Sequence, residues 1–238
     1  MTEMDLRRRN FLKTSLGTAA VAIAPGILLF DVAHGKPQAV SGKVRWGMLI
    51  DTTQCREGCN DCVTACNKEN GLSGSTRPTD AQWIRKIEIK EISTGRQVSL
   101  PMMCQHCEKP PCVDVCPTGA SFKGVDGIVL VDKHLCIGCR YCMMACPYKA
   151  RSFIHEPLSD QNPDVPRGKG TVESCTMCVH RVDNGQQPAC AESCTNKAIL
   201  FGDLNDPESE ISRKIRSVAS VQLRADLGLN TGVRYQGL

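Results

Sequence analysis

The feature that most constrains this sequence is a set of sixteen cysteines, which fall into four groups of four between residues 55 and 194. The groups are Cys55, Cys59, Cys62 and Cys66; Cys104, Cys107, Cys112 and Cys116; Cys136, Cys139, Cys142 and Cys146; and Cys175, Cys178, Cys190 and Cys194. In a chain of 238 residues, only 2 Trp, 3 Tyr and 5 Phe are available to anchor an apolar core. We therefore expect groups bound to sulfur to replace part of that core.

The third group has the spacing C-x2-C-x2-C-x3-C followed by Pro147, which is the cluster-binding signature of bacterial ferredoxins. Three closely spaced thiolates wrap one [4Fe–4S] cluster, and in two-cluster ferredoxins the fourth thiolate ligates the other cluster. Motifs of this kind therefore work in pairs. Four groups predict two pairs and four [4Fe–4S] clusters, with all sixteen cysteines as ligands.

The other three groups depart from this spacing. The second has four residues between its middle cysteines and the fourth has eleven, which predicts a longer loop at that point. The first begins with a gap of three residues, between Cys55 and Cys59, where the signature has two. Gly58 can absorb the extra residue because glycine adopts a positive φ without steric cost. We therefore favour Cys55 as a ligand, and a site with three ligands is the alternative.

Disulfides and structural zinc are the other common uses of grouped cysteines. A disulfide scaffold does not require four similar groups, two of which are followed by a proline, Pro117 and Pro147. A structural zinc ion takes four ligands in a tetrahedron, so four cysteines within eleven residues would overcrowd it. A structural metal-binding scaffold therefore stays a second hypothesis behind electron transfer.

The first 35 residues have the layout of an export signal. Residues 8–13 read R-R-N-F-L-K, which resembles the R-R-x-F-L-K motif of twin-arginine signals, and an apolar stretch follows over 16–30. Because twin-arginine export moves folded proteins, clusters inserted in the cytoplasm would cross the membrane intact. We expect residues 1–35 to be this signal and the protein to be periplasmic, peripheral to the inner membrane. Retention of the signal as an anchor is the alternative to cleavage after Gly35.

We expect an α+β fold in which residues 36–202 form two fused modules like bacterial ferredoxins, with short strands, small helices and cluster-binding loops. Strands are predicted at 46–50, 84–92, 98–102 and 128–131, and a glycine-containing turn at 93–96 predicts a hairpin. Residues 157–170, with several prolines and polar side chains, predict a surface loop. We expect residues 203–238 to form an extension that braces the fold or docks a partner, with a helix over 211–227.

The ends of three cysteine groups repeat, which indicates an internal duplication. The repeated positions are Cys112, Cys116, Ala120 and Phe122; Cys142, Cys146, Ala150 and Phe153; and Cys190, Cys194, Ala198 and Phe201.

Residues 46–207 resemble the four-cluster ferredoxin-like subunits that accompany molybdopterin oxidoreductases and quinone-linked membrane complexes. The resemblance rests on C-Q-H-C, P-P-C and C-P-T-G-A in the second group, the whole third group, C-T-M-C in the fourth, and F-G-D-L-N-D-P at 201–207. It implies that the first group pairs with the fourth and the second with the third. The implied ligand sets are Cys55, Cys59, Cys62 and Cys194; Cys175, Cys178, Cys190 and Cys66; Cys104, Cys107, Cys112 and Cys146; and Cys136, Cys139, Cys142 and Cys116.

The resemblance also implies a function. The protein is expected to relay single electrons between a quinone-interacting integral-membrane subunit of the NrfD or DsrP type and a further redox subunit, such as a multihaem cytochrome or a molybdopterin enzyme. Within the family it resembles most the DsrO-type subunits of sulfite-reduction-associated complexes, with NrfC-type subunits close behind. An electron-transfer subunit of a nitrite, tetrathionate or polysulfide reductase is the alternative.

The sequence predicts no catalytic site of the chain's own, because it contains neither a G-x-G-x-x-G nucleotide motif nor a cysteine outside the four groups. A self-sufficient reductase is therefore disfavoured. The net charge of +4 is spread along the chain without a basic face, which argues against nucleic acid as a partner.

Several basic residues lie near cysteines in the sequence and have two interpretations. They either raise cluster potentials or, as we favour, are ordinary solvated charges; they are Arg140, Lys149, Arg151, Arg181 and Lys197. Three histidines are interpreted as packing or hydrogen-bonding residues and not as ligands, because the thiolates already complete the clusters; they are His106, His134 and His180.

Overall fold

The computed structural model describes residues 21–24, 27–29, 41–74, 77, 79–159 and 161–238. The chain divides into two compact units, residues 1–38 and 39–238. In the first unit, strand β1 (Val21–Ala24) pairs antiparallel with β2 (Ile27–Leu29). The expected twin-arginine residues 8–13 and the expected cleavage site after Gly35 lie outside the described residues.

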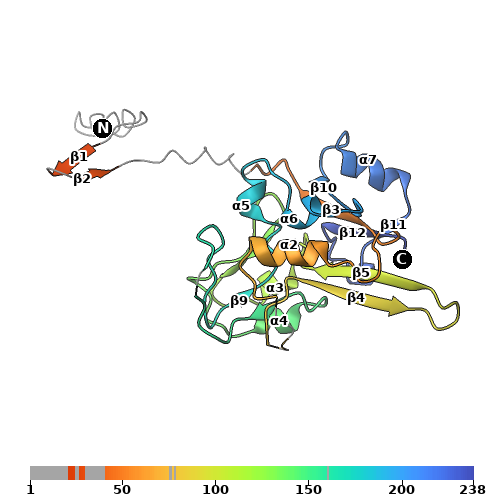
Figure 1. Cartoon of the computed structure of the whole chain (residues 1–238), viewed down its shortest axis with the longest axis horizontal. Coiled ribbons are helices and arrows are strands. Elements are labelled where there is room, and N and C mark those ends of the chain that lie inside the picture. Colours follow the sequence, from red (N-terminus) through yellow and green to blue (C-terminus); the bar gives the residue numbers. More distant parts are fainter. Residues whose placement is uncertain (1–20, 25–26, 30–40, 75–76, 78, 160) are drawn as a thin grey trace. The chain divides into compact units, whose positions relative to one another are not determined.

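A four-stranded sheet organises the second unit (Figure 1). Its order is β10 (Ile199–Asp203), β3 (Trp46–Asp51), β12 (Val233–Gln236) and β11 (Ser220–Val221). β10 runs antiparallel to β3, β12 runs parallel to β3, and β11 runs antiparallel to β12. The strand predicted at 46–50 is confirmed as β3, which joins residues from opposite ends of the unit into one sheet.

The C-terminal residues are an integral part of this sheet. Val233 and Tyr235 of β12 are fully buried. The Tyr235 hydroxyl donates to the carbonyl oxygen of Pro101 at 3.1 Å and accepts a hydrogen bond from the Gln105 amide at 3.1 Å. The expected extension beyond residue 203 therefore contributes β11 and β12 to this sheet and braces it from within.

Helix α7 (Glu210–Ser217) packs on β10, and its N-terminus is capped by the Ser209 hydroxyl, which accepts from the Ser212 N–H at 3.2 Å. The helix predicted over 211–227 is wrong beyond Ser217. Val218 has an extended backbone and the chain then pairs with β12 as β11, before a single 3₁₀ turn at Ala225–Leu227. Strand pairing with β12, which itself lies beside β3 in the sheet, overrides local helix propensity here.

Three hairpins surround the sheet. β4 (Ile84–Lys90) pairs with β5 (Gln97–Met103), and the turn between them lies at 91–96, so the predicted hairpin is confirmed. Figure 1 shows it as a long projecting ribbon. The two shorter hairpins join β6 (Ser121–Lys123) to β7 (Val129–Val131) and β8 (Ser152–Phe153) to β9 (Val172–Glu173). The loop predicted at 157–170 is mostly exposed in its described part. Within it, the side chain of Val165 is buried.

The short helices begin or lie at the cysteine groups. They are α2 (Asp61–Glu69), α3 (Pro111–Asp114), α4 (Tyr141–Ala145), α5 (Val179–Val182) and α6 (Ala189–Glu192). α2 carries Cys62 and Cys66, and α3, α4 and α6 each carry one cysteine. Mixed short helices, short strands and cysteine-bearing loops confirm the predicted α+β class.

Cysteine thiols take a large share of the interior. The main core combines apolar residues such as Met48, Ile50 and Trp83 with buried cysteines from all four groups. Sulfur therefore occupies space that aromatic side chains would fill in an ordinary domain. Among the described residues, no helix is long and apolar enough to cross a bilayer.

Candidate iron–sulfur centres

All sixteen cysteines are free thiols, and eight of them, from the second and third groups, line two hollows. One hollow is lined by four thiols of the second and third groups, Cys104, Cys107, Cys112 and Cys146. A second hollow is lined by the remaining four, Cys116, Cys136, Cys139 and Cys142. In each set, three thiols come from one group and the fourth comes from the other.

The first and fourth groups interlock in the same way. Burial, with the neighbouring thiols of Cys55 and Cys194, raises the pKa of Cys62 to about 11, and Cys55 also lies beside Cys59. In the other set, burial raises the pKa of Cys175 well above its usual value, and the thiols of Cys66, Cys190 and Cys178 raise it further. These neighbours are compatible with the ligand sets that the family resemblance implies.

Because these thiols are buried, they lose their protons with difficulty unless a metal cation binds them. Burial raises the pKa of Cys104 and of Cys107 to about 12, and adjacent thiols of the same set contribute. Four buried thiolates in one hollow would repel one another, whereas a bound metal deprotonates coordinating thiols. The four convergent sets of sulfur donors therefore fit iron–sulfur clusters.

Backbone N–H groups point at several of the sulfurs. Four residues beyond the last cysteine of a group, the N–H of Ala150 donates to Cys146 Sγ at 3.5 Å and that of Ala198 to Cys194 Sγ at 3.2 Å. Ser121 N–H donates to Cys116 Sγ at 3.3 Å. Because Ala150 and Ala198 occupy equivalent positions of the internal repeat, the duplication has preserved this hydrogen bond. Such N–H···S contacts orient a ligand and stabilise its negative charge.

Gly58 supports the unusual spacing of the first group. Its φ is +74°, as expected from the sequence, and a side chain there would have open space around it. The extra residue is thus accommodated in a left-handed turn, and Cys55 lies with Cys59, Cys62 and Cys194.

Arg151 differs from the other basic residues near the cysteines. It is 6% exposed, and its Nη2 donates to Cys112 Sγ at 3.1 Å and to Ser121 Oγ at 2.8 Å. The favoured interpretation of a solvated charge is wrong for Arg151, because the fold closes over it. Lys149 and Lys197 are exposed, as that interpretation predicts.

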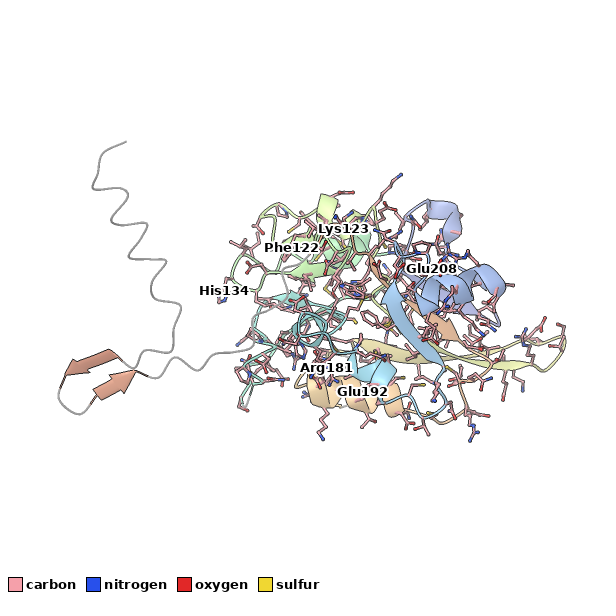
Figure 2. The ribbon with its side chains drawn as sticks, turned by 90° about the horizontal axis from the view of Figure 1, so that it is seen from above. Phe122, Lys123, His134, Arg181, Glu192 and Glu208 are labelled. Atoms are coloured by element: carbon pink, nitrogen blue, oxygen red, sulfur yellow. The ribbon has the colours of Figure 1, made fainter. Side chains whose placement is uncertain are left out.

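Two other arginines near the cysteines are partnered on the surface. Arg140 lies over the ring of Phe153, 3.8 Å from its centroid. Arg181 forms ion pairs with Glu69 and Glu192, and Figure 2 shows Arg181 and Glu192 side by side.

Two of the three histidines make hydrogen bonds, as interpreted from the sequence. His106 is buried and accepts the N–H of Val129 on Nδ1 at 3.0 Å; burial lowers its pKa to about 3, so the ring is neutral. His180 contacts the Glu69 carboxylate at 2.8 Å. His134 is exposed, near the surface of the unit in Figure 2.

Sequence reasoning missed two polar side chains beside the thiols. Asn70 is buried, and its side-chain amide donates to Cys66 Sγ at 3.5 Å. Asn70 lies four residues after Cys66, at the offset where the repeat has alanine. The repeat therefore marks this position in the sequence as one that lies beside a thiol. Lys133 donates to the carbonyl oxygen of Val172 at 2.8 Å, and burial lowers its pKa to about 8. No sequence signal marks Lys133, because its burial depends on β9.

Two family models describe the chain as a 4Fe-4S dicluster domain, one matching residues 54–120 and the other residues 96–204. Together they span all four cysteine groups. Two such domains hold two clusters each, so the protein carries four [4Fe–4S] clusters.

Curated relatives match the chain over nearly its whole length. An Hdr-like menaquinol oxidoreductase iron–sulfur subunit 1 from Archaeoglobus fulgidus is 40% identical, covering 99% of this chain and 99% of the relative. A tetrathionate reductase subunit from Salmonella typhimurium is 38% identical over 99% of this chain and 90% of the relative. The NrfC protein of Escherichia coli is 39% identical over 94% of this chain and 92% of the relative.

Two of these relatives are named as subunits of an oxidoreductase or a reductase. The chain therefore belongs to the 4Fe-4S dicluster family of iron–sulfur electron-transfer subunits of oxidoreductase complexes.

Proposed function

We propose that the sixteen cysteines hold the four clusters in four sets, each made of three thiols of one group and one thiol of its partner group. The sets are Cys55, Cys59, Cys62 and Cys194; Cys66, Cys175, Cys178 and Cys190; Cys104, Cys107, Cys112 and Cys146; and Cys116, Cys136, Cys139 and Cys142. The observation that carries this proposal is the crossing of the fourth thiol of each group into the set of its partner group.

Bound [4Fe–4S] clusters supply one-electron redox chemistry. The chain contributes the thiolates, a largely buried setting and the N–H donors at Ser121, Ala150 and Ala198, which stabilise charge on sulfur. Cys139 is exposed, whereas most of the other cysteines are buried. Its cluster set is therefore the one that a redox partner can approach with least protein in between.

The protein, we further propose, works in the periplasm, peripheral to the inner membrane, after twin-arginine export. It would relay single electrons between a quinone-interacting membrane subunit and a second redox subunit, a multihaem cytochrome or a molybdopterin enzyme. The R-R-N-F-L-K sequence at 8–13 supports export. The relative named as part of a menaquinol oxidoreductase supports the link to quinone.

A sulfite-reduction-associated complex is the first candidate for its setting, on the strength of the sequence resemblance. A tetrathionate- or nitrite-reductase type complex is the second candidate. It is favoured by the likeness to the tetrathionate reductase relative and to NrfC at almost the same identity.

Iron and acid-labile sulfide per chain, measured on anaerobically purified protein with EPR of the reduced sample, tests the ligand assignment. We expect about sixteen irons and sixteen sulfides, with signals from interacting clusters. About twelve irons or a three-iron signal would instead assign three ligands to the first set and remove Cys55. Tightly held zinc with negligible iron would refute the proposal.

Export is tested separately by replacing Arg8 and Arg9 with lysine in the full-length chain. The expected result is that iron–sulfur protein accumulates in the cytoplasm, whereas the parent chain fractionates with the periplasm. Equal periplasmic amounts of both proteins would contradict twin-arginine export. Affinity purification of the parent chain from solubilised membranes then identifies the membrane subunit and the terminal reductase.

A further inference from the structure

Arg151 is a buried cation among thiols of two different sets. Its guanidinium donates to Cys112 Sγ, and the charges that act on it are those of Cys112, Cys104 and Cys142. Cys112 and Cys104 belong to one set of four, and Cys142 belongs to the other. Arg151 therefore lies between the two sets formed by the second and third cysteine groups.

No carboxylate in the described part of the chain forms an ion pair with Arg151, and its Nη1 has no hydrogen-bond partner there. A buried guanidinium without an anion nearby is strongly unfavourable. The anions that surround it are the cysteine sulfurs. Its charge therefore acts on whatever those sulfurs hold.

The internal repeat shows that this charge is confined to one module. Arg151 is the fifth residue after Cys146, and the fifth residues after Cys116 and Cys194 are Ser121 and Ile199. Ser121 accepts a hydrogen bond from Arg151 at 2.8 Å, whereas Ile199 is buried and apolar. In the module of the second and third cysteine groups, Arg151 and Ser121 therefore face each other as a cation and its hydroxyl partner. In the module of the first and fourth groups, Ile199 places an apolar side chain at the equivalent position.

The other module has no comparable buried cation at that position. Lys86 acts on Cys55 and Cys62, but it is only half-buried, so water screens its charge. Arg181 near Cys178 is neutralised by the Glu69 and Glu192 carboxylates. The two modules therefore differ in the charge buried next to their thiols.

We propose that Arg151 is a positioning residue that raises the reduction potentials of the two clusters held by the second and third cysteine groups, and so sets them apart from the other two. The proposal rests on the ligand sets given under the proposed function. Reduction adds one electron, supplied by a redox partner subunit, to an anionic centre without making or breaking a bond. A fixed buried cation favours the form that carries the added negative charge.

Redox titration of the full-length, cluster-loaded protein, monitored by EPR, tests this inference with Arg151→Gln. Glutamine removes the charge but keeps an amide that can donate to Cys112 and Ser121. We expect the equilibrium constant for reducing two of the four clusters to fall at least tenfold, which for a one-electron couple is about 59 mV. The other two clusters serve as the internal control and are expected to be unchanged. Ser121→Ala, which keeps the charge and removes one hydrogen bond, is expected to cause a smaller shift.

Unchanged potentials in a variant with about sixteen irons would overturn the inference. An equal shift of all four clusters would overturn it as well, because that result indicates general distortion. If Arg151→Gln fails to load its clusters, Arg151→Lys decides. Equilibrium constants for reduction within tenfold of those of the parent protein support the role of charge, and a larger fall in a fully loaded variant refutes it. Absence of clusters from the parent protein would instead refute the proposed function.

Discussion

Replacing Gly138 with alanine tests how closely the third cysteine group is built against its surroundings. Gly138 lies between Cys136 and Cys139 with φ at +71°, and an added Cβ would lie 2.2 Å from the carbonyl oxygen of Gly170 and 3.1 Å from Phe153 Cε2. A left-handed backbone costs a non-glycine residue about 1–2 kcal/mol. Moving the Gly170 backbone aside adds about 1–3 kcal/mol, the usual range for overpacking.

The expected total loss is therefore about 2–5 kcal/mol, concentrated at one cluster set. Because the clash can be relieved by shifting the loop that carries Cys136 and Cys139, we expect Gly138→Ala to lose the cluster of that set first. The assay is iron per chain after anaerobic gel filtration, followed by the denaturant midpoint of the same sample. About twelve irons are expected in place of about sixteen.

Gly58→Ala is the matched control, since Gly58 also directly precedes a cysteine and has φ at +74° but has no atom within 4 Å of an added Cβ. It carries only the left-handed backbone cost of about 1–2 kcal/mol and is expected to retain its iron. Equal iron content and equal denaturant midpoints in the two variants would show that the close approach to Gly170 does not matter, and the steric argument would fail.

Three further predictions concern other parts of the protein. Tyr235→Phe removes a fully buried hydroxyl that makes two hydrogen bonds, and should lower the free energy of unfolding by about 1–3 kcal/mol in denaturant titrations; an unchanged midpoint would contradict this. Burial acts to raise the pKa of Glu69, but hydrogen bonds from His180 and Arg181 outweigh it and hold the pKa below its usual value. The stabilisation by Glu69 is thus present above the unfolded-state pKa and is lost as the pH falls through the folded-state value, so Glu69→Gln should flatten the acid limb of the stability profile, and an identical acid limb would refute it. Because Cys139 is exposed, controlled exposure to air should convert its cluster to a three-iron EPR signal before the others, and simultaneous loss of all clusters would contradict that order.

The internal repeat shows both the reach and the limit of sequence reasoning. The alanines four residues after Cys146 and Cys194 were recognised as repeated positions, and their N–H groups do contact the preceding thiols. The equivalent role of Asn70 could have been found from the same offset. The role of Arg151 could not, because its neighbours Cys112 and Ser121 lie 39 and 30 residues away and no local pattern shows that the fold buries it.

The tail shows the same limit at the level of secondary structure. A helix was predicted over 211–227 and forms only as far as Ser217, because the following residues find a strand partner in β12. The predicted hairpin between β4 and β5 was found because its turn and both strands lie within one short segment. Local turn chemistry decides such a hairpin, whereas β11 pairs with β12, which is itself held beside β3 from the other end of the unit.

The sequence by itself determined the kind of cofactor, the number of clusters and the class of fold. It could do so because three of the thiols of each cluster set lie close together in the chain, so their spacing records the shape of what they hold. Only the tertiary structure decided that β12 enters the sheet beside β3, and that Arg151 is buried while Lys149 is exposed. Those outcomes depend on burial and pairing between segments far apart in the sequence, and no short pattern of residues records them.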